Sequence, residues 1–361
     1  MKTTDKKILM SDSIPFLAIV ELGKFIRAYL SGQTFETLST WNTFSEQLNE
    51  ITERSIHYNG WFTPEQVTFS LQQWSEALTE ENLKNWLKNY YLPVQESKKI
   101  GLILAGNIPL VGFHDFICVL LSGHQVVAKR SSNDQLLISF MANFLIESQP
   151  DLKNKIHFVE GKLENFDAVI ATGSNNTARY FEYYFKNVPS IIRKNRNSVA
   201  LLTGKETHEE LVALGEDIFR YFGLGCRNVS KLFVPQDYDF KAFFEAIFQY
   251  KEVIEYERYA NNYDYNKAVY LMSQFKILDN GFLTLKEDLS HASPISSVFY
   301  ETYNHLENVI EKIENDKEHI QCVVGSQSIV FPKLIPFGQT QKPQLNDYAD
   351  GIDTLTFLSN L

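Results

Sequence analysis

The run Lys99-Ile-Gly-Leu-Ile-Leu-Ala-Gly-Asn107 is a short apolar segment that ends at a glycine, which is typical of a buried parallel strand. The chain from residue 14 to about residue 92 is predicted to be mostly helical, with Thr63 and Thr79 as N-cap residues. After the run, helices are predicted over 109–121 and 134–148, and strands over 125–129, 155–159 and 166–172. This alternation predicts a parallel sheet with helices on both faces.

A second α/β region is predicted after residue 198. Its strands are expected over 199–202, 231–234 and 268–271, and its helices over 209–222 and 307–316. With 361 residues the chain is long enough for two domains. The predicted fold class is therefore α/β, with two parallel-sheet, Rossmann-like domains and an N-terminal helical segment.

Composition excludes several classes of protein. The net charge is −10 and there is no block of lysine or arginine, which argues against nucleic-acid binding. There is no uninterrupted apolar run of about 18 residues, so we expect no membrane span and a cytoplasmic protein. Cys118, Cys226 and Cys322 are widely spaced and the histidines are not clustered, which argues against disulfides and against a metal site.

Polar or glycine-rich turns follow three of the predicted strands. They are Gly106-Asn107, Lys129-Arg-Ser-Ser132 and Thr172-Gly-Ser174. Ligands of open parallel sheets bind at the carboxyl ends of the strands, so these turns are predicted to form a binding edge.

Cys226 has the most reactive setting of the three cysteines. It lies in Tyr221-Phe-Gly-Leu-Gly-Cys226-Arg-Asn228, where the glycines allow a substrate to approach the backbone closely. The neighbouring Arg227 is a cation that favours the thiolate form. Cys118 lies in an apolar run and is predicted to be a small buried hydrophobic residue, and Cys322, in Ile320-Gln-Cys-Val-Val324, is predicted to be a strand residue.

The order of these motifs resembles that of the aldehyde dehydrogenase superfamily. Asn107-Ile-Pro109, Lys129, Thr172-Gly-Ser174, Gly225-Cys226 and Pro336-Phe-Gly338 follow one another as in that superfamily. The similarity spans roughly residues 95–340 and is greatest to the acyl-CoA reductase branch, the LuxC-like family of the fatty-acid reductase subunit of bacterial bioluminescence. It implies an N-terminal and NAD(P)-binding domain over 1–197, a catalytic domain over 198–338, and a tail over 339–361 for packing or oligomer contacts.

The resemblance also implies roles for individual residues. Cys226 would be the nucleophile that carries the acyl group as a thioester, and Asn107 would supply an oxyanion-hole amide. Lys129 would contact the adenosine ribose of the cofactor. Ser132 lies where many relatives have a glutamate, and together with the cation of Arg130 its hydroxyl suits a 2′-phosphate, which favours NADPH over NADH. The remaining cofactor residues would bind the pyrophosphate at a helix start: Thr172, Gly173 and Ser174.

Two departures from the superfamily pattern bear on the reaction. Hydrolytic relatives have a glutamate about 34 residues before the cysteine, where this chain has Ile192-Arg-Lys194. Without that base an acyl-enzyme would persist until a thiol or a hydride attacked it. Ser290 replaces a glutamate that binds the nicotinamide ribose, and the adjacent His291 is either a proton donor or an ordinary surface or core histidine.

The predicted function is the NADPH-dependent reduction of a fatty acyl-CoA, with a long chain favoured, to the aldehyde. One alternative is oxidation of an aldehyde to an acyl-CoA or an acid, and another is a non-catalytic subunit of an acyl-transfer complex. Coenzyme A thioester is the expected substrate, with an acyl-transferring protein as a candidate partner and a homo-oligomer as a candidate assembly. The aromatic residues between 256 and 270 could line an acyl tunnel or simply pack in the core: Tyr256, Tyr259, Tyr263, Tyr265 and Tyr270.

Overall fold

The computed structural model describes residues 10–36 and 39–361, which form two compact units. One unit contains the chain up to Lys194 together with Gln344–Leu361, and the other contains Asn195–Pro343. Each unit is built on its own β-sheet, as expected for the predicted α/β class. The roles assigned above to the domains stay predictions.

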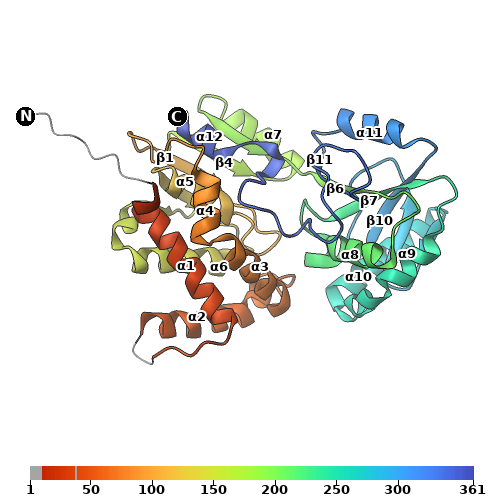
Figure 1. Cartoon of the computed structure of the whole chain (residues 1–361), viewed down its shortest axis with the longest axis horizontal. Helices are drawn as coiled ribbons and strands as arrows, with labels where there is room; N and C mark the ends of the chain where they lie inside the picture. Colours follow the sequence, from red (N-terminus) through yellow and green to blue (C-terminus); the bar gives the residue numbers. More distant parts are fainter. Residues whose placement is uncertain (1–9, 37–38) are drawn as a thin grey trace, which may run out of the picture. The chain divides into compact units, whose positions relative to one another are not determined.

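The sheet of the first unit is five-stranded and parallel, in the order β3-β2-β1-β4-β5. Its strands are β1 (Lys99–Ile103), β2 (Gln125–Lys129), β3 (Ile156–Phe158), β4 (Ala168–Thr172) and β5 (Ser190–Arg193). Its helices are α1 (Ile14–Leu30), α2 (Thr40–Tyr58), α3 (Pro64–Ala77), α4 (Glu80–Leu87), α5 (Phe113–Leu121), α6 (Gln135–Ser148), α7 (Asn175–Tyr184) and α12 (Thr354–Ser359). Short 3₁₀ turns are η1 (Met10–Asp12), η2 (Pro150–Asn154) and η5 (Ala349–Gly351). The predicted parallel sheet is confirmed (Figure 1).

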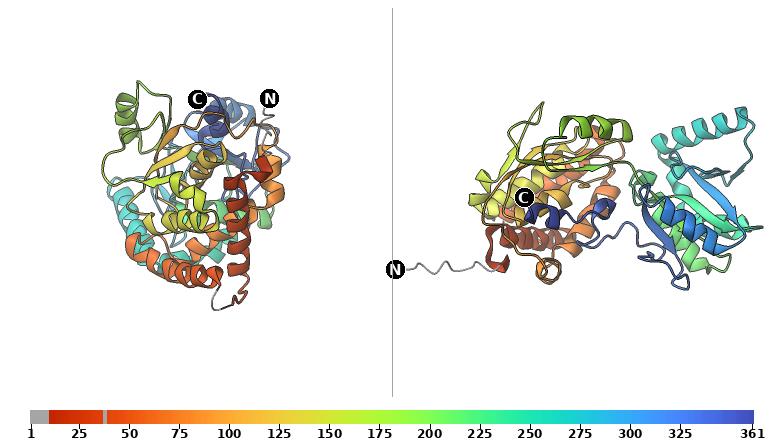
Figure 2. Two further views of the ribbon diagram at one scale, coloured as in Figure 1. Left: turned by 90° about the vertical axis from the view of Figure 1, so that its left-hand side faces the viewer. Right: turned by 90° about the horizontal axis from the view of Figure 1, so that it is seen from above.

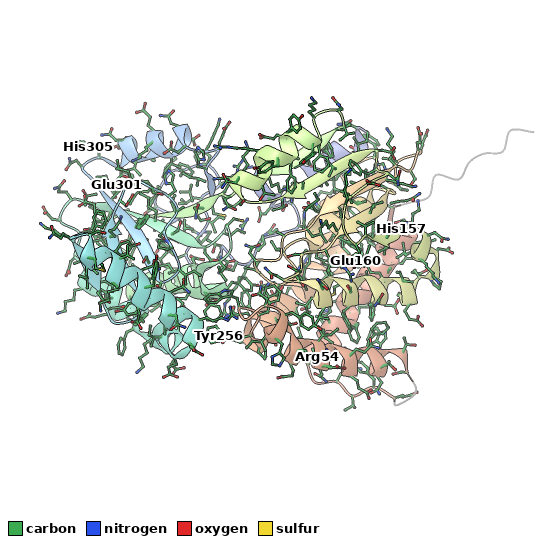
Figure 3. All side chains as sticks on the ribbon, turned by 180° about the vertical axis from the view of Figure 1, so that it is seen from behind. Arg54, His157, Glu160, Tyr256, Glu301 and His305 are labelled. Atoms are coloured by element: carbon green, nitrogen blue, oxygen red, sulfur yellow. The ribbon has the colours of Figure 1, made fainter. Side chains whose placement is uncertain are left out.

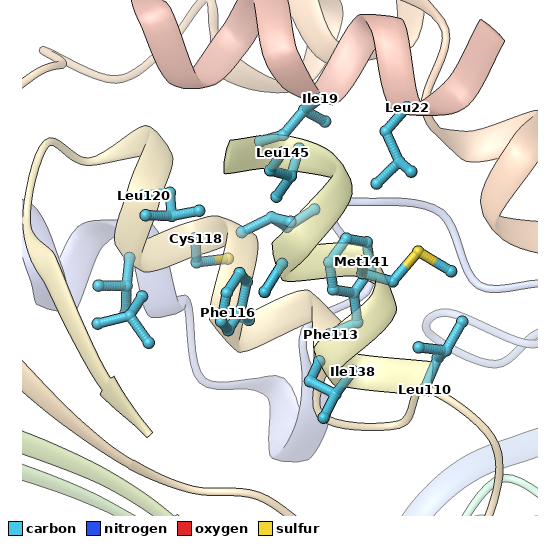
Figure 4. Close-up of a cluster of buried hydrophobic side chains, with 14 of the residues drawn as sticks. Ile19, Leu22, Leu110, Phe113, Phe116, Cys118, Leu120, Ile138, Met141 and Leu145 are labelled. Atoms are coloured by element: carbon cyan, nitrogen blue, oxygen red, sulfur yellow. The ribbon is translucent and has the colours of Figure 1, made fainter. Parts of the chain in front are cut away.

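Alternate residues of these strands point to opposite faces of the sheet. Ile100 and Leu102 of β1 pack in the main core with α1, α5 and α6, part of which is shown in Figure 4. Val169 and Ala171 of β4 face the other way and pack against Phe181 of α7. The N-terminal helices α1, α2 and α3 pack together beside α6 (Figures 1 and 2).

The predicted N-caps are confirmed, and one helix start differs from the prediction. The Thr63 and Thr79 side chains each accept a hydrogen bond from a backbone N–H of the first helical turn. The helix predicted from residue 109 begins at Phe113. Leu110 has a left-handed backbone (φ 59°), which a continuous helix cannot contain.

The second unit has a six-stranded sheet in the order β11-β6-β7-β10-β9-β8, parallel except for the β8–β9 pair. Its strands are β6 (Asn197–Leu201), β7 (Val229–Pro235), β8 (Ile277–Asp279), β9 (Thr284–Glu287), β10 (Ser297–Tyr303) and β11 (Ile320–Gly325). Its α-helices are α8 (His208–Phe219), α9 (Phe240–Ile247), α10 (Glu257–Met272) and α11 (Leu306–Asn315). Its 3₁₀ segments are η3 (Arg220–Gly223) and η4 (Phe248–Glu255).

The strand predicted over 268–271 is wrong, because these residues form the last turn of α10. The buried residues of α10 recur every three or four positions, which is the period of a helix and not of a strand: Tyr259, Tyr263, Asn266 and Tyr270. Tyr265 is 69% exposed. The Tyr259 hydroxyl donates to the Phe282 carbonyl at 2.9 Å, so this ring has an ordinary packing role.

The C-terminal segment from Gln344 packs on the first unit. Trp86 Nε1 of α4 donates to the Tyr348 hydroxyl at 2.8 Å, and His124 contacts the Leu358 carbonyl at 3.0 Å. A role for this tail in oligomer contacts stays a prediction. Within residues 10–36 and 39–361, none of the helices has the length and apolar character needed to cross a membrane.

Candidate active site

The structure brings the three polar turns of the first unit to one edge of its sheet. Ile103, the last residue of β1, pairs with Lys129 at the end of β2 on one side and with Ala171 near the end of β4 on the other. The turns that carry Asn107, Lys129 and Thr172 therefore leave the same carboxyl edge from three adjacent strands. Ligands of doubly wound sheets bind at such an edge.

The turns after β1 and β2 are tightly packed on each other. The Leu104 N–H donates to the Lys129 carbonyl at 3.1 Å. A Cβ added to Gly106 would lie 2.4 Å from Ser131 Oγ, so only glycine fits at this approach. Asn107 follows directly and is exposed at the edge.

Asp134 supports the Asn107 turn and was missed in the sequence analysis. Its side chain is buried, and its Oδ2 accepts the N–H of Leu110 at 2.7 Å. Burial raises the pKa of Asp134 to about 7, although the Leu110 N–H opposes this shift. Its place just before α6 is a helix-start signal in the sequence, but the contact with Leu110 is not visible there.

Arg130 is already engaged by neighbouring side chains. Its guanidinium donates to Ser139 Oγ at 2.6 Å and to Glu160 Oε1 at 2.7 Å, and it lies 4.8 Å from the centre of the Phe158 ring. The Glu160 side chain, labelled in Figure 3, is 87% exposed, so this ion pair is weak and exchangeable. Lys129 and Ser132 are exposed beside it.

Thr172, Gly173 and Ser174 connect β4 to the start of α7. Ser174 is the N-cap, and its Oγ accepts the Thr177 N–H at 3.2 Å. A Cβ on Gly173 would lie 3.0 Å from Thr177 and from Phe181, so the turn is closely packed. The positive end of the helix dipole at this turn suits the pyrophosphate of a nicotinamide cofactor.

Cys226 belongs to the second unit, in the turn that precedes β7, and is the one cysteine of the three that is not buried. Ser198 Oγ donates to the Cys226 carbonyl at 3.0 Å. Arg227 Nε donates to the Thr340 carbonyl. The backbone around the thiol is therefore anchored on β6 and on the segment that follows Pro336-Phe-Gly338.

A buried carboxylate anchors that segment. Asp217 of α8 accepts the Gly338 N–H at 2.7 Å and the Thr340 N–H and Oγ1 at 3.0 and 2.8 Å. Burial raises the pKa of Asp217 to about 6, against the effect of these three hydrogen bonds. Asp217, like Asp134, was missed in the sequence analysis, because Gly338 is 121 residues away in the chain.

The other two cysteines are buried; burial was predicted for Cys118 and a strand position for Cys322, and both predictions are confirmed. Cys118 is fully buried in α5, and burial raises the pKa of its thiol well above the usual value. Cys322 is a strand residue of β11 with 5% exposure. Neither has the access that a nucleophile requires.

The strand at the position of the missing glutamate, β5, has no carboxylate side chain. Its Arg193 is buried and makes a bidentate ion pair with Asp115 of α5, while Arg193 Nη2 also donates to Thr354 Oγ1 at 3.0 Å.

In the second unit, His291 Nε2 lies 2.9 Å from Asp316 Oδ2, and the His291 side chain is 13% exposed. This arrangement fits a mostly buried, paired histidine.

Among the described residues, no group of three or more histidine, cysteine or acidic side chains is arranged to hold a metal ion. Asn107 and the predicted cofactor residues belong to one unit and Cys226 to the other. A joint action of Asn107 and Cys226 therefore stays a prediction.

Comparison with known proteins gives a family match and a set of similar folds. The family model described as acyl-CoA reductase (LuxC) matches residues 19–248, more than half of the chain. An indole-3-acetaldehyde dehydrogenase solved with NAD+ is 14% identical with a TM-score of 0.62, covering 88% of this chain and 72% of that one. An aldehyde dehydrogenase from Bacillus cereus, also an NAD+ complex, is 12% identical with a TM-score of 0.59, covering 91% and 75%. No curated protein sequence matches the chain.

Proposed function

Because the chain belongs to the acyl-CoA reductase (LuxC) family, whose model it matches over residues 19–248, we propose that it reduces a fatty acyl-CoA to the aldehyde through a thioester on Cys226. The observation that carries the proposal is the setting of Cys226. It is the one accessible cysteine, and it lies in a glycine-flanked turn whose carbonyl is fixed by Ser198. The family match supports an oxidoreductase; the chain length of the acyl group, NADPH and the cysteine intermediate are parts of the proposal.

In the first half-reaction the Cys226 thiolate attacks the thioester carbonyl of the acyl-CoA. The Asn107 side-chain amide donates a hydrogen bond to the oxygen as negative charge develops on it. The carbon–sulfur bond to coenzyme A breaks, and the coenzyme leaves as its thiolate. The product is an S-acyl enzyme, with no net oxidation or reduction.

In the second half-reaction NADPH, when bound, supplies the hydride that reduces the acyl carbon. Cys226 then leaves as the thiolate when the carbon–sulfur bond breaks, and the aldehyde is released. Thr172, Gly173 and Ser174 would hold the cofactor pyrophosphate at the start of α7, and Lys129 with Ser132 would contact its adenosine half. Arg130 would bind the 2′-phosphate after exchanging Glu160 for it.

The direct test follows NADPH oxidation that depends on added acyl-CoA. We expect Cys226→Ala to lose activity by on the order of 10⁴-fold or more, as expected when a covalent nucleophile is removed. Cys322→Ala is the matched control, because it removes a buried cysteine of the same unit. Retained activity in Cys226→Ala, together with the absence of an acyl adduct on the wild-type Cys226 peptide, would overturn the proposal.

The same enzyme distinguishes reduction from its reverse. We expect an aldehyde and NADP+ to give little free acid in the absence of coenzyme A, because β5 offers no carboxylate to activate water. Rapid acid formation without coenzyme A would instead support a hydrolytic aldehyde dehydrogenase. The acyl donor, coenzyme A or an acyl-carrying partner protein, is identified by comparing the rates of Cys226 acylation from each.

A further inference from the structure

The chain that leads from α8 to Cys226 has an unusual backbone. Helix α8 ends at Phe219, and Tyr221, Phe222 and Gly223 then have φ values of 53°, 56° and 77°. Left-handed backbone is uncommon for bulky side chains and is retained only where surrounding contacts enforce it. Such outliers concentrate at functional sites.

The side chain of Asn228 binds the carbonyls that directly precede this left-handed backbone. Its Nδ2 donates to the Arg220 carbonyl at 2.8 Å and to the Asp217 carbonyl at 3.0 Å, with the Ile218 carbonyl at 3.4 Å. These carbonyls belong to the last turn of α8 and to the residue after it, where a helix has no donors of its own. Asn228 is only 2% exposed, so these hydrogen bonds are shielded from water.

The other end of the same amide fixes the turn that contains Cys226. Asn228 Oδ1 accepts the Gly225 N–H at 2.8 Å, and the Asn228 N–H donates to the Gly225 carbonyl at 3.0 Å. Cys226 and Arg227 are therefore the two central residues of a turn that is closed from both sides by one residue. The amide joins this turn to the end of α8.

We infer that Asn228 is a positioning residue for Cys226, which it holds by connecting the Cys226 turn to the carboxyl end of α8. This inference rests on the proposed function of Cys226. An aspartate at 228 could still accept the Gly225 N–H, but it has no hydrogens to donate to the α8 carbonyls. Of the two residues, only asparagine therefore makes both ends of the link. Asn228 acts through the backbone of Cys226.

The test compares Asn228→Ala and Asn228→Asp with wild type. The measured quantity is the rate at which acyl-CoA acylates Cys226 in the whole protein, followed by mass spectrometry of the peptide that contains Cys226 after digestion. The matched control is Asn266→Ala, which removes another buried asparagine of the second unit, whose Nδ2 donates to the Ile295 carbonyl. We expect both Asn228 variants to acylate about 10- to 100-fold more slowly at saturating acyl-CoA. We expect KM for acyl-CoA to change by less than about threefold, because the positioning effect lies in orientation and not in uniform binding.

Loss of folding is monitored in the same samples. Iodoacetamide alkylates any accessible thiol and needs no oriented substrate. The buried Cys118 and Cys322 react only when their unit unfolds, so their alkylation measures the unfolded fraction. Acylation rates are therefore compared per folded molecule, and Asn228→Asp, which keeps the side-chain volume, is used if Asn228→Ala is largely open. Wild-type acylation rates in both folded Asn228 variants would overturn the inference alone. A wild-type Cys226 that acyl-CoA does not acylate would overturn the proposed function and the inference with it.

Discussion

The buried carboxyl of Asp134 predicts a measurable dependence of stability on pH. The residue is 5% exposed, its Oδ1 has no hydrogen-bond partner among the described residues, and burial raises its pKa to about 7. In the unfolded chain an aspartate has a pKa of about 3.9. The native state therefore binds this proton more tightly than the unfolded state does.

Stability therefore falls as the pH rises. The stability contributed by protonated Asp134 is present in full below about pH 4 and is lost as the pH rises through about 7. At pH 5 the pH is about two units below the native pKa, and each unit corresponds to about 1.4 kcal/mol, which gives a contribution of roughly 3 kcal/mol. At pH 8 this contribution is close to zero.

Asp134→Asn removes the titration while it keeps an oxygen that can accept the Leu110 N–H. We expect the free energy of unfolding of this variant, relative to wild type, to rise by roughly 3 kcal/mol between pH 5 and pH 8. Urea unfolding at four pH values over that range measures it. The matched control, Asp239→Asn, removes the charge of the exposed N-cap carboxylate of α9, where asparagine still caps the helix, and reports the effect of losing an aspartate charge without burial. A difference between Asp134→Asn and wild type that stays constant from pH 5 to pH 8 would refute the reasoning.

Three further outcomes are expected. Gly106→Ala introduces a Cβ against Ser131 and should lower kcat/KM for NADPH by at least about tenfold, and Ser131→Gly in the same chain should restore most of the loss, as steady-state kinetics would show. Glu160→Gln frees Arg130 from its ion pair and should lower KM for NADPH about two- to fivefold, with KM for NADH unchanged. Tyr259→Phe loses a buried hydrogen bond and should lower the free energy of unfolding by about 1 kcal/mol, while the dependence of activity on acyl chain length stays as in wild type.

Local sequence pattern predicted four of the five strands of the first sheet, β1 to β4, because each of them is a short apolar run; β5, Ser190–Arg193, was not predicted. The second sheet was predicted less completely. Ala268-Val-Tyr-Leu271 has strand composition, and only the spacing of Tyr259, Tyr263 and Tyr270 over a longer window shows the buried face of a helix. Strand β10, Ser297–Tyr303, was not predicted, since it mixes apolar with polar residues although it lies between β7 and β9.

The residues that carry chemistry and the residues that support them differ in how far the sequence reveals them. Cys226 is flanked by glycine and arginine, so the neighbouring residues in the sequence are enough to indicate a reactive thiol. Asn228 and Asp217 are ordinary polar residues in the sequence, and their importance lies in what they contact. The partners of Asp217 are more than 120 residues away, which no local pattern encodes.

The structure also gives a reason why the missing glutamate cannot simply be replaced by another carboxylate on β5. The side chains at positions 192 and 193 are both packed against neighbouring residues. Arg193 points toward α5, where it neutralises buried Asp115, so an acidic residue there would place two carboxylates together without a cation. Ile192 points to the opposite face and packs in the apolar cluster with Phe181 and Phe185 of α7 and the residues after it, where a charged side chain would be desolvated.

A carboxylate introduced at position 192 or 193 would therefore disturb the packing of the first unit. In the proposed reaction, the lifetime of an acyl group on Cys226 is set by the arrival of a hydride or of a thiol, because β5 provides no side chain to activate water. We therefore expect Ile192→Glu to lower the free energy of unfolding without giving hydrolysis of the acyl-enzyme to the free acid. Free acid release by a fully folded Ile192→Glu enzyme would show that the cluster tolerates the charge and that packing does not decide the fate of the acyl group.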